Sequence, residues 1–409
     1  MTYKTATCCR LCKSKKFKVI VDLGLQSLTG YFPAQGEEVE KGPLILIRCL
    51  ECNLVQLQHS FEPTKMYGED YGYRSGLNMS MVRHLEDKVS KLEESMTFDK
   101  NDIILDIGSN DGTLLGSYKN RDSTFIGMDP TANKFKEFYK DDIKIVSDFF
   151  SAEKYLELEN KPAKIITSIS MFYDLEDPVK FAQDVSRVLS PNGIWHFEQS
   201  YLPLMIKTNS YDTICHEHLE YYSFEVVEEI LKRANLRALS VDFNNINGGS
   251  FSISACHKNS NLTEDISVLN TRISEKELNL NNHEIYNDFA NEIEKHKKDL
   301  ITLLEELKSK NKSIYGFGAS TKGNVTLQHC KISTDLLDGV FEVNESKFGK
   351  FTPGSSIPII NQIEIDKISP DYLLILPWHF KKDIIARNGK KFQDMGIKLI
   401  FPFPAIEII

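Results

Sequence analysis

The stretch of residues 103–115, Ile-Ile-Leu-Asp-Ile-Gly-Ser-Asn-Asp-Gly-Thr-Leu-Leu, constrains the fold more than any other part of this chain. Its apolar start predicts a buried strand, and the turn with Gly108 and Gly112 predicts the start of a helix. In an open α/β sheet such a turn lies at the carboxyl end of a strand, where ligands bind. We therefore expect an α/β domain with a ligand site at this turn.

The spacing of the turn indicates which ligand it binds. Asp106-x-Gly108-x-x-x-Gly112 matches the dinucleotide fingerprint G-x-G-x-x-G poorly, and it matches the first motif of S-adenosylmethionine (SAM) methyltransferases well. An ordinary strand-to-helix turn is the plain alternative. Further strands, separated by helices, are predicted at 125–129, 143–146, 163–168 and 193–198. This succession indicates a mostly parallel sheet, and the Ser-Pro-Asn-Gly turn before the last strand favours a methyltransferase over a dehydrogenase.

Residues at the carboxyl ends of these strands are the expected cofactor contacts. Asp129 ends the second strand, where a Rossmann-like site places a carboxylate for the ribose hydroxyls. Asp148 and Phe149 follow the third strand, where they are placed to contact the adenine. The full set expected to bind SAM is Asp106, Gly108, Asn110, Gly112, Asp129, Asp148, Phe149 and Ser170.

Two matching cysteine pairs, Cys9-x-x-Cys12 and Cys49-x-x-Cys52, lie near the N-terminus. Each pair can aim two thiolates at one point, and two such pairs complete a tetrahedral zinc site. Buried or redox-active cysteines are the alternative, and Cys8 has the less suitable spacing for a ligand. Four thiolates leave no open position, so we expect a structural zinc rather than a catalytic one.

The composition limits the partners of the chain. Its 409 residues carry a net charge of −9, with 41% hydrophobic and 26% charged residues, which suggests a globular protein of about two or three domains. The acidic balance disfavours nucleic acid and anionic membranes as partners. No apolar run is long enough to span a bilayer, and the first residues lack the apolar core of a signal peptide. We expect a cytoplasmic enzyme that is a monomer or a weak dimer.

The densest polar cluster of the sequence is Cys215-His-Glu-His-Leu-Glu-Tyr-Tyr222. Histidine is the side chain best suited to take a proton near neutral pH, and a neighbouring carboxylate can orient its ring. The spacing differs from H-E-x-x-H, which argues against zinc ligation on a helix. A hydrogen-bonded structural histidine pair is the alternative. We expect a catalytic role, because the cluster directly follows the candidate SAM domain.

A second strand, glycine turn and helix begin at residue 313. The turn Gly316-Phe-Gly-Ala-Ser-Thr-Lys-Gly323 carries a lysine and lacks the third glycine of a dinucleotide fingerprint. A helix N-terminus with Ser320 and Lys322 suits a phosphate. An NAD site and a site for a phosphorylated substrate group are both consistent with this pattern, and a plain structural turn is the alternative. The end of the chain is thus expected to form a second Rossmann-like unit.

Polar segments connect these units. Residues 66–77 contain three tyrosines and three glycines, and the sequence alone favours a packed connector there. A hairpin at 237–243 and 250–255 is predicted to close the central sheet. Within residues 259–312, apolar side chains recur at helical spacing, which predicts a long amphipathic helix without chemistry of its own.

Together and in this order, the motifs resemble those of zinc-containing sugar C-methyltransferases that act on nucleotide-linked keto-deoxysugars. The resemblance covers nearly the whole chain and rests on the cysteine quartet, Tyr71-Gly-Tyr73, Leu105–Gly112, Cys215–Tyr222, Gly316–Asn324 and Phe351-Thr-Pro-Gly354. It implies a zinc-binding lobe (1–65), a SAM methyltransferase domain (66–258), linking helices (259–312) and a C-terminal Rossmann-like domain (313–409) that binds the nucleotide-sugar.

The resemblance also implies roles for single residues. His218 matches the general base, Glu217 lies beside it, and Tyr71 or Tyr73 matches the active-site tyrosine. The implied substrate contacts are His216, Tyr222, Gln199, Ser320, Lys322, Asn324, Glu342 and Trp378. Family members that act at C3 of 4-keto sugars can carry tyrosine where this chain has Cys215, so the resemblance leaves the sugar and the methylated carbon open.

The mechanistic hypothesis is that His218 removes the proton beside a ketone, giving an enolate that attacks the SAM methyl group. Three rival functions stand beside it. A sugar O-methyltransferase would need a base as well, and an NAD-dependent oxidoreductase would use the C-terminal glycine turn. A non-catalytic or nucleic-acid-binding zinc protein is disfavoured by the acidic balance.

Overall fold

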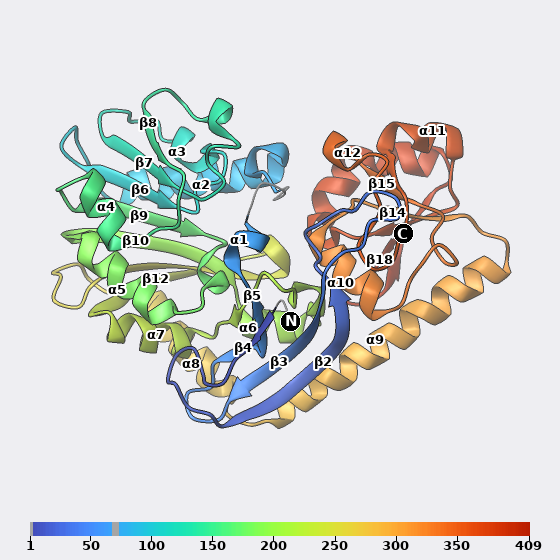
Figure 1. Cartoon of the computed structure of the whole chain (residues 1–409), viewed down its shortest axis with the longest axis horizontal. Coiled ribbons are helices and arrows are strands. Elements are labelled where there is room, and N and C mark those ends of the chain that lie inside the picture. Colours follow the sequence, from blue (N-terminus) through green and yellow to red (C-terminus); the bar gives the residue numbers. More distant parts are fainter. Residues whose placement is uncertain (1–2, 68–72) are drawn as a thin grey trace.

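The computed structural model describes residues 3–67 and 73–409. Figure 1 shows two α/β lobes beside each other, formed by the central and the C-terminal parts of the chain. The hairpin of β2 (Phe17–Ser27) and β3 (Lys41–Cys49) runs beneath them, together with the long helix α9 (Glu284–Ser309). No helix in these ranges has an apolar stretch that could cross a bilayer.

The central lobe is built on a seven-stranded sheet of order β12-β13-β10-β9-β6-β7-β8. The strands β6 to β10 run parallel, and β13 runs antiparallel to both β10 and β12, which confirms the predicted closing hairpin. From β6 the chain proceeds outward through β7 and β8, and it then returns to β9 on the other side of β6. The carboxyl ends of β6 and β9 are therefore a topological switch point, where open α/β sheets bind their ligands. The strands are β6 (Ile103–Ile107), β7 (Thr124–Met128), β8 (Ile143–Val146), β9 (Ala163–Ile169), β10 (Leu189–Ser200), β12 (Leu236–Asn244) and β13 (Ser250–His257).

Helices cover both faces of this sheet because its strands are apolar on both sides. Ile103 and Leu105 pack in one core with α4 (Ala152–Leu158), α5 (Pro178–Val188) and α7 (Phe224–Arg233). Ile104 packs in another core with α2 (Met79–Ser95) and α3 (Thr113–Gly116). The helix expected after Gly112 is a single turn; Ser117 Oγ donates to Thr113 O at 2.7 Å at its end, and the tyrosine that follows is buried in the core. A further helix, α6 (Leu202–Lys207), follows β10.

The N-terminal lobe contains a four-stranded sheet of order β11-β4-β3-β2. Its strands β2, β3 and β4 (Val55–Leu57) come from the first 57 residues, whereas β11 (Glu220–Tyr221) comes from the central lobe. A separate pair is formed by β1 (Tyr3–Thr5) and β5 (His59–Phe61), and α1 (Pro63–Met66) follows. The central lobe thus supplies an edge strand to the N-terminal sheet.

The C-terminal lobe is a second α/β unit with the strand order β16-β15-β14-β17-β18-β19, in which only β19 is antiparallel. This confirms the predicted Rossmann-like unit. Its strands are β14 (Ile314–Phe317), β15 (Val340–Glu342), β16 (Ile359–Asn361), β17 (Tyr372–Ile375), β18 (Lys398–Phe401) and β19 (Glu407–Ile408). Its helices are α10 (Thr321–His329), α11 (Ile365–Ile368) and α12 (Lys381–Asp394).

The linking segment forms two helices, α8 (Ile266–Leu278) and α9, and α9 is the long amphipathic helix that was expected. The predicted apolar face of α9 is buried at Phe289, Ile293 and Leu300. One hydrophobic core contains side chains from the N-terminal sheet, the central lobe, α9 and the C-terminal sheet. The lobes are therefore packed together and not merely tethered.

Candidate active site and zinc site

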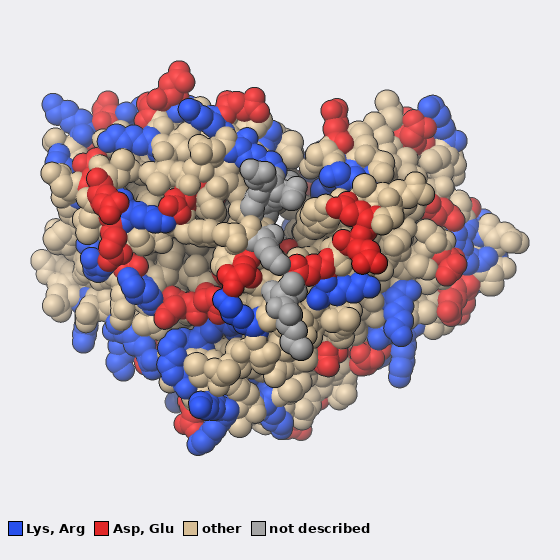
Figure 2. Space-filling view, in the orientation of Figure 1, with Lys and Arg blue, Asp and Glu red and all other residues tan. Residues whose placement is uncertain are grey.

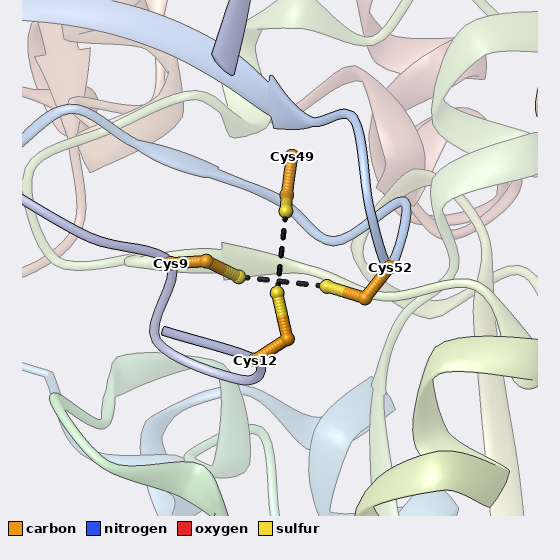
Figure 3. A group of neighbouring side chains, drawn as sticks. All are labelled: Cys9, Cys12, Cys49 and Cys52. Carbon is orange, nitrogen blue, oxygen red and sulfur yellow. Dashed lines mark hydrogen bonds between the residues drawn. The ribbon is translucent and has the colours of Figure 1, made fainter. Parts of the chain in front are cut away.

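Four cysteine side chains converge in the N-terminal lobe. The Sγ atoms of Cys9, Cys12, Cys49 and Cys52 lie within 4.8 Å of one another, and the Cys9–Cys52 and Cys12–Cys49 pairs are 3.5 Å apart (Figure 3). Zn–S bonds of about 2.3 Å in a tetrahedron place the sulfurs about 3.8 Å apart, so the four thiolates fit one zinc ion. All four positions are filled by protein, which makes this a structural site.

Both cysteine pairs lie in the same kind of turn. Lys13 N donates to Cys9 O at 3.0 Å, and Asn53 N donates to Cys49 O at 3.1 Å. Lys13 (φ 62°) and Asn53 (φ 61°) take the left-handed conformation directly after the second cysteine of each pair. The two turns are equivalent, and each aims two sulfurs at the same point.

The zinc lobe is bonded to the central lobe next to its cysteines. Arg10 Nε lies 3.3 Å from Glu176 Oε2 and 3.4 Å from Glu220 Oε1. Arg233 Nη1 donates to Leu11 O at 2.9 Å. Because Arg10 and Leu11 stand between the first two cysteines, the metal site is fixed to the central lobe as well as to its own sheet.

The glycine turn of residues 108–112 lies at the switch point of the central sheet. Gly108 (φ 75°) and Gly112 (φ 73°) take the left-handed conformation that favours glycine. A Cβ atom on Gly108 would lie 3.0 Å from Met171 Cγ, and one on Gly112 would lie 2.7 Å from Tyr139 Cδ1. The backbone conformation and the close neighbours both require glycine at these positions.

Buried carboxyl groups lie around this turn. Asp106, in β6, accepts a hydrogen bond from Thr167 Oγ1 at 2.6 Å, and burial raises the pKa of Asp106 to about 7 against that bond. Asp129 Oδ2 accepts from Asn110 N at 3.0 Å, and Asp111 is also buried. Predicted cofactor residues from two strands are therefore in one place, and their negative field suits a sulfonium cation.

Residues 73–77, the end of the tyrosine-rich segment 66–77 (the tyrosine loop), lie directly on the glycine turn. Ser75 N donates to Asn110 Oδ1 at 2.9 Å, and Asn110 Nδ2 donates to Tyr73 O at 3.1 Å. Gly76 N donates to Asp111 Oδ2 at 2.9 Å. These three bonds make residues 73–77 part of the site, where the sequence alone favoured a packed connector.

The remaining predicted cofactor residues lie at the carboxyl ends of β8 and β9. Asp148 and Phe149 follow β8; Asp148 forms an ion pair with Lys154 at 2.5 Å, and the side chain of Phe149 is 39% exposed. Ser170 follows β9 with a φ of 55°, and its N–H donates to Glu198 O at 2.7 Å. Phe149 thus presents an accessible ring at the edge where the adenine is expected.

His218 lies against the loop that follows β9. Its ring centroid is 4.2 Å from that of Tyr173, and Tyr173 belongs to the same loop as Met171, the neighbour of Gly108. His218 Nδ1 is 2.9 Å from Thr213 O. A carbonyl only accepts hydrogen bonds, so Nδ1 carries the hydrogen and Nε2 of the neutral ring carries the lone pair. Nε2 is therefore the atom that can take a proton.

The charge state of His218 suits a base. Burial and then the Lys322 ammonium group lower the pKa of His218 to about 3, and the bond to Thr213 O opposes this. The imidazole is therefore neutral near pH 7, with a free lone pair. Without substrate it is a weak base, so the site needs a further group to favour proton removal.

Two carboxyl groups lie beside His218. Burial raises the pKa of Glu217, and the hydrogen bond that its Oε2 accepts from Thr29 Oγ1 at 3.2 Å opposes this. Burial also raises the pKa of Asp174 well above its ordinary value, against a hydrogen bond with Tyr67 and with support from the charge of Glu217. The Tyr67 hydroxyl donates to Glu217 O at 3.4 Å. The site therefore holds weakly ionised acids next to a neutral histidine.

The zinc lobe holds the histidine segment in place. Leu57 N donates to Leu219 O at 2.8 Å, and β4 pairs with β11 immediately after it. From the other side, Leu219 N donates to Tyr173 O at 2.8 Å. The residue after His218 is thus fixed between the edge of the N-terminal sheet and the loop beside the glycine turn.

The C-terminal lobe contacts the central lobe near the histidine segment. Lys322 Nζ donates to Asn247 O, and Trp378 Nε1 donates to Asp212 Oδ2 at 2.7 Å. The predicted substrate residues Lys322 and Trp378 therefore lie where this lobe meets the central one. Figure 2 shows acidic and basic side chains interspersed on this face of the molecule.

The other predicted residues of this lobe shape its own glycine turn. Ser320 Oγ caps α10, and Asn324 Nδ2 donates to Thr29 O at 2.8 Å. Glu342, at the end of β15, accepts from Ala319 N at 2.9 Å. Asn324 thereby ties the C-terminal turn to the N-terminal segment that also contacts Glu217.

Three predicted substrate contacts are not brought to His218. His216 is 2% exposed and packs edge-on against Phe61 of the zinc lobe. Tyr222 is fully buried and stacks on Phe172 at a centroid distance of 5.3 Å. Gln199 is fully buried, and its amide makes no hydrogen bond to any residue in the described ranges.

Two solved methyltransferase structures resemble the chain over less than half of its length. The mitomycin 7-O-methyltransferase MmcR is 12% identical, with a TM-score of 0.34, and the match covers 44% of this chain and 55% of MmcR. A SAM-dependent methyltransferase from Clostridium acetobutylicum is 15% identical, with a TM-score of 0.32, covering 43% of this chain and 92% of that one.

Family models match three successive segments of the chain. A "Putative zinc binding domain" matches residues 9–67, a "Methyltransferase domain" matches 77–241 and a "C-methyltransferase C-terminal domain" matches 245–404. The C-methyltransferase NovU of Streptomyces niveus is 27% identical over 408 residues, which cover 98% of this chain and 96% of NovU. These matches show a SAM-dependent methyltransferase that is similar to C-methyltransferases.

Sequence reasoning assigned no role to several residues around His218. Tyr67, Tyr173 and Asn247 contact predicted site residues, and Asp174 lies beside Tyr67 and Glu217, yet none of the four is part of a recognised motif. Their only signal was position, because they lie in the tyrosine loop, after a strand end or in the closing hairpin. Tyr71 lies outside the described residues, and the Tyr73 side chain is 47% exposed.

Proposed function

We propose that this enzyme methylates a carbon atom beside the ketone of a nucleotide-linked keto-deoxysugar, with His218 as the general base. The observation that carries the proposal is the free Nε2 of His218 next to the loop that adjoins the Gly108 turn. SAM, when bound at that turn, supplies the electrophilic methyl group. The sugar would lie at the junction of the lobes, and the nucleotide would lie toward α10.

The proposed step uses only groups that the site holds. A ketone acidifies the neighbouring C–H bond, and Nε2 takes that proton. Nδ1 stays bonded to Thr213 O throughout, so the ring keeps its orientation as it becomes positive. The Tyr67 hydroxyl donates to the backbone oxygen of Glu217, the residue before this base.

The test is a panel of nucleotide-linked 4-keto-sugars incubated with enzyme and SAM, with mass spectrometry for a gained methyl group and NMR to place it on carbon or oxygen. His218→Asn should lower turnover by about 10²–10⁴-fold while calorimetry shows unchanged SAM binding. His257→Asn, a half-buried histidine of the same lobe that bonds to Leu189 O at 3.0 Å, serves as the matched control. A methyl group on oxygen, or near-normal turnover of His218→Asn, would contradict the proposal.

A further inference from the structure

Lys322 is a buried cation that reaches from the C-terminal lobe into the central lobe. It is the second residue of α10 and only 9% exposed, and its Nζ donates to Asn247 O. Asn247 Nδ2 donates in turn to Ser170 Oγ at 3.4 Å, at the carboxyl end of β9. The ammonium group is thereby held at the junction between the lobes, near the carboxyl end of β9.

Charged and titratable groups from several elements face this ammonium group. Burial lowers the pKa of Lys322, and the carboxylate of Asp212 opposes this, with a smaller contribution from Cys215. Trp378 fixes Asp212 from the C-terminal lobe. In addition to burial, Lys322 lowers the pKa values of His218 and His379. Through Asn247 and Ser170 the ammonium group is also held at the start of the loop after β9, and Tyr173 of that loop contacts His218.

We propose that Lys322 is a catalytic residue that stabilises the enolate oxygen formed when His218 removes the substrate proton. This inference rests on the proposed function. The C–H bond breaks, its proton goes to His218 Nε2, its electron pair forms the C=C bond, and the carbonyl π pair moves onto oxygen beside the Lys322 ammonium group. The ammonium group keeps its proton, and no other reactant is needed.

A cation at this place explains how a weak base such as His218 can remove the substrate proton. In the free enzyme, Lys322 helps to keep His218 neutral, so Nε2 is available at neutral pH. During the step a negative charge forms on oxygen and a positive one on the imidazole. The fixed ammonium group then faces an anion, and a preorganised cation in a dry site stabilises such a charge strongly. The backbone carbonyl of Asn247 aims the ammonium group before the substrate binds.

The experiment isolates proton removal from methyl transfer. The enzyme is incubated in deuterium oxide with the keto-sugar identified by the panel and with S-adenosylhomocysteine, and NMR follows deuterium uptake at the carbon beside the ketone. The variants are Lys322→Met, which removes the charge at similar size, and Lys322→Arg, which keeps it. Lys308→Met is the control, because Lys308 is also partly buried and paired with a carboxylate, Asp338, at 2.7 Å.

We expect Lys322→Met to slow deuterium uptake about 10²–10³-fold, with less than about 3-fold change in the dissociation constants of SAM and of the keto-sugar. Lys322→Arg should retain an intermediate rate, and Lys308→Met the full rate. Loss of the nearby charge should also raise the pKa of His218, so the acid limb of the residual rate in Lys322→Met moves to higher pH.

Deuterium uptake by Lys322→Met within about 3-fold of the wild type would overturn the inference, as would a loss confined to substrate binding. A borohydride-trapped adduct on Lys322 would replace it with an imine mechanism. Wild-type methylation without deuterium uptake at any carbon would instead remove the proposed function, and the inference with it.

Discussion

Glu198→Gln is predicted to destabilise the fold by about 3 kcal/mol, because Glu198 is the centre of a buried network beneath the active site. Its carboxylate lies 2.6 Å from His84 Nε2 and 2.5 Å from Lys88 Nζ. It also accepts from Asn244 Nδ2 at 2.6 Å and from Ser252 Oγ at 2.7 Å. The side chain is fully buried, so an amide in its place would leave the ammonium group of Lys88 in the interior without a counter-charge.

The size of the effect follows from the pKa of Glu198. Burial by itself raises that pKa, but the bond to His84 and the charge of Lys88 outweigh burial. Together they lower the pKa of Glu198 from 4.5 to about 2. At about 1.4 kcal/mol for each pH unit, this corresponds to about 3 kcal/mol. Because the pKa in the folded state is depressed, the stabilisation is complete above pH 4.5 and is lost as the pH falls toward 2.

Urea denaturation at several pH values tests this. At pH 7 Glu198→Gln should unfold with a free energy about 3 kcal/mol lower than the wild type, and roughly half of this difference should remain at pH 3. The double variant Glu198→Gln/Lys88→Met should recover part of the loss, since no buried charge is then left unpaired. Glu407→Gln, at an exposed ion pair with Lys381, should change stability by less than about 1 kcal/mol. A loss below about 1 kcal/mol for Glu198→Gln, or one independent of pH, would refute the reasoning.

Two further predictions concern the metal and the cofactor. Chelation of zinc, or Cys12→Ser, should increase hydrogen exchange at Leu219 and in β11, because β4 links the cysteine turns to that strand. Unchanged exchange at these residues would contradict the link. Cys8→Ser is the control. Gly112→Ala should weaken SAM binding at least about tenfold and destabilise the fold by about 1–3 kcal/mol, since its φ is 73° and its Cβ would meet Tyr139. Normal SAM affinity of Gly112→Ala by calorimetry would refute the second prediction. Gly36 has a similar φ but open space around it, so Gly36→Ala measures the cost of backbone strain without the steric clash.

The features that could be predicted from sequence are those that short stretches encode. The Gly108–Gly112 turn needs a fixed conformation over five residues, and each cysteine pair forms a turn of four. Strands and helices have short sequence periods, so the alternation of elements predicted a mostly parallel central sheet, although not its strand order. Local periodicity and turn chemistry were sufficient for the fold class and the zinc site.

Long-range contacts could not be predicted in this way. His84 and Glu198 are 114 positions apart, and nothing in either stretch indicates that they meet. His216 and His218 were expected to act together, but the chain turns at His216 and Glu217, so the two rings enter different lobes. Asn247 was expected to be part of a hairpin connection, and its backbone oxygen also accepts a hydrogen bond from Lys322 of the C-terminal lobe. Such contacts depend on how the folded lobes pack against each other, which short stretches of sequence do not encode.

The strand β11 has a consequence for how the molecule is made. The N-terminal sheet takes its last strand from residues 220–221, so the part of the chain that leaves the ribosome first keeps an uncovered edge until synthesis has passed residue 221. A fragment cut after residue 67 would keep all four cysteines and still expose the open edge of β4, a ready template for pairing with other chains. The metal-binding lobe is therefore a separate unit in sequence, but only a chain that extends past residue 221 can complete its sheet.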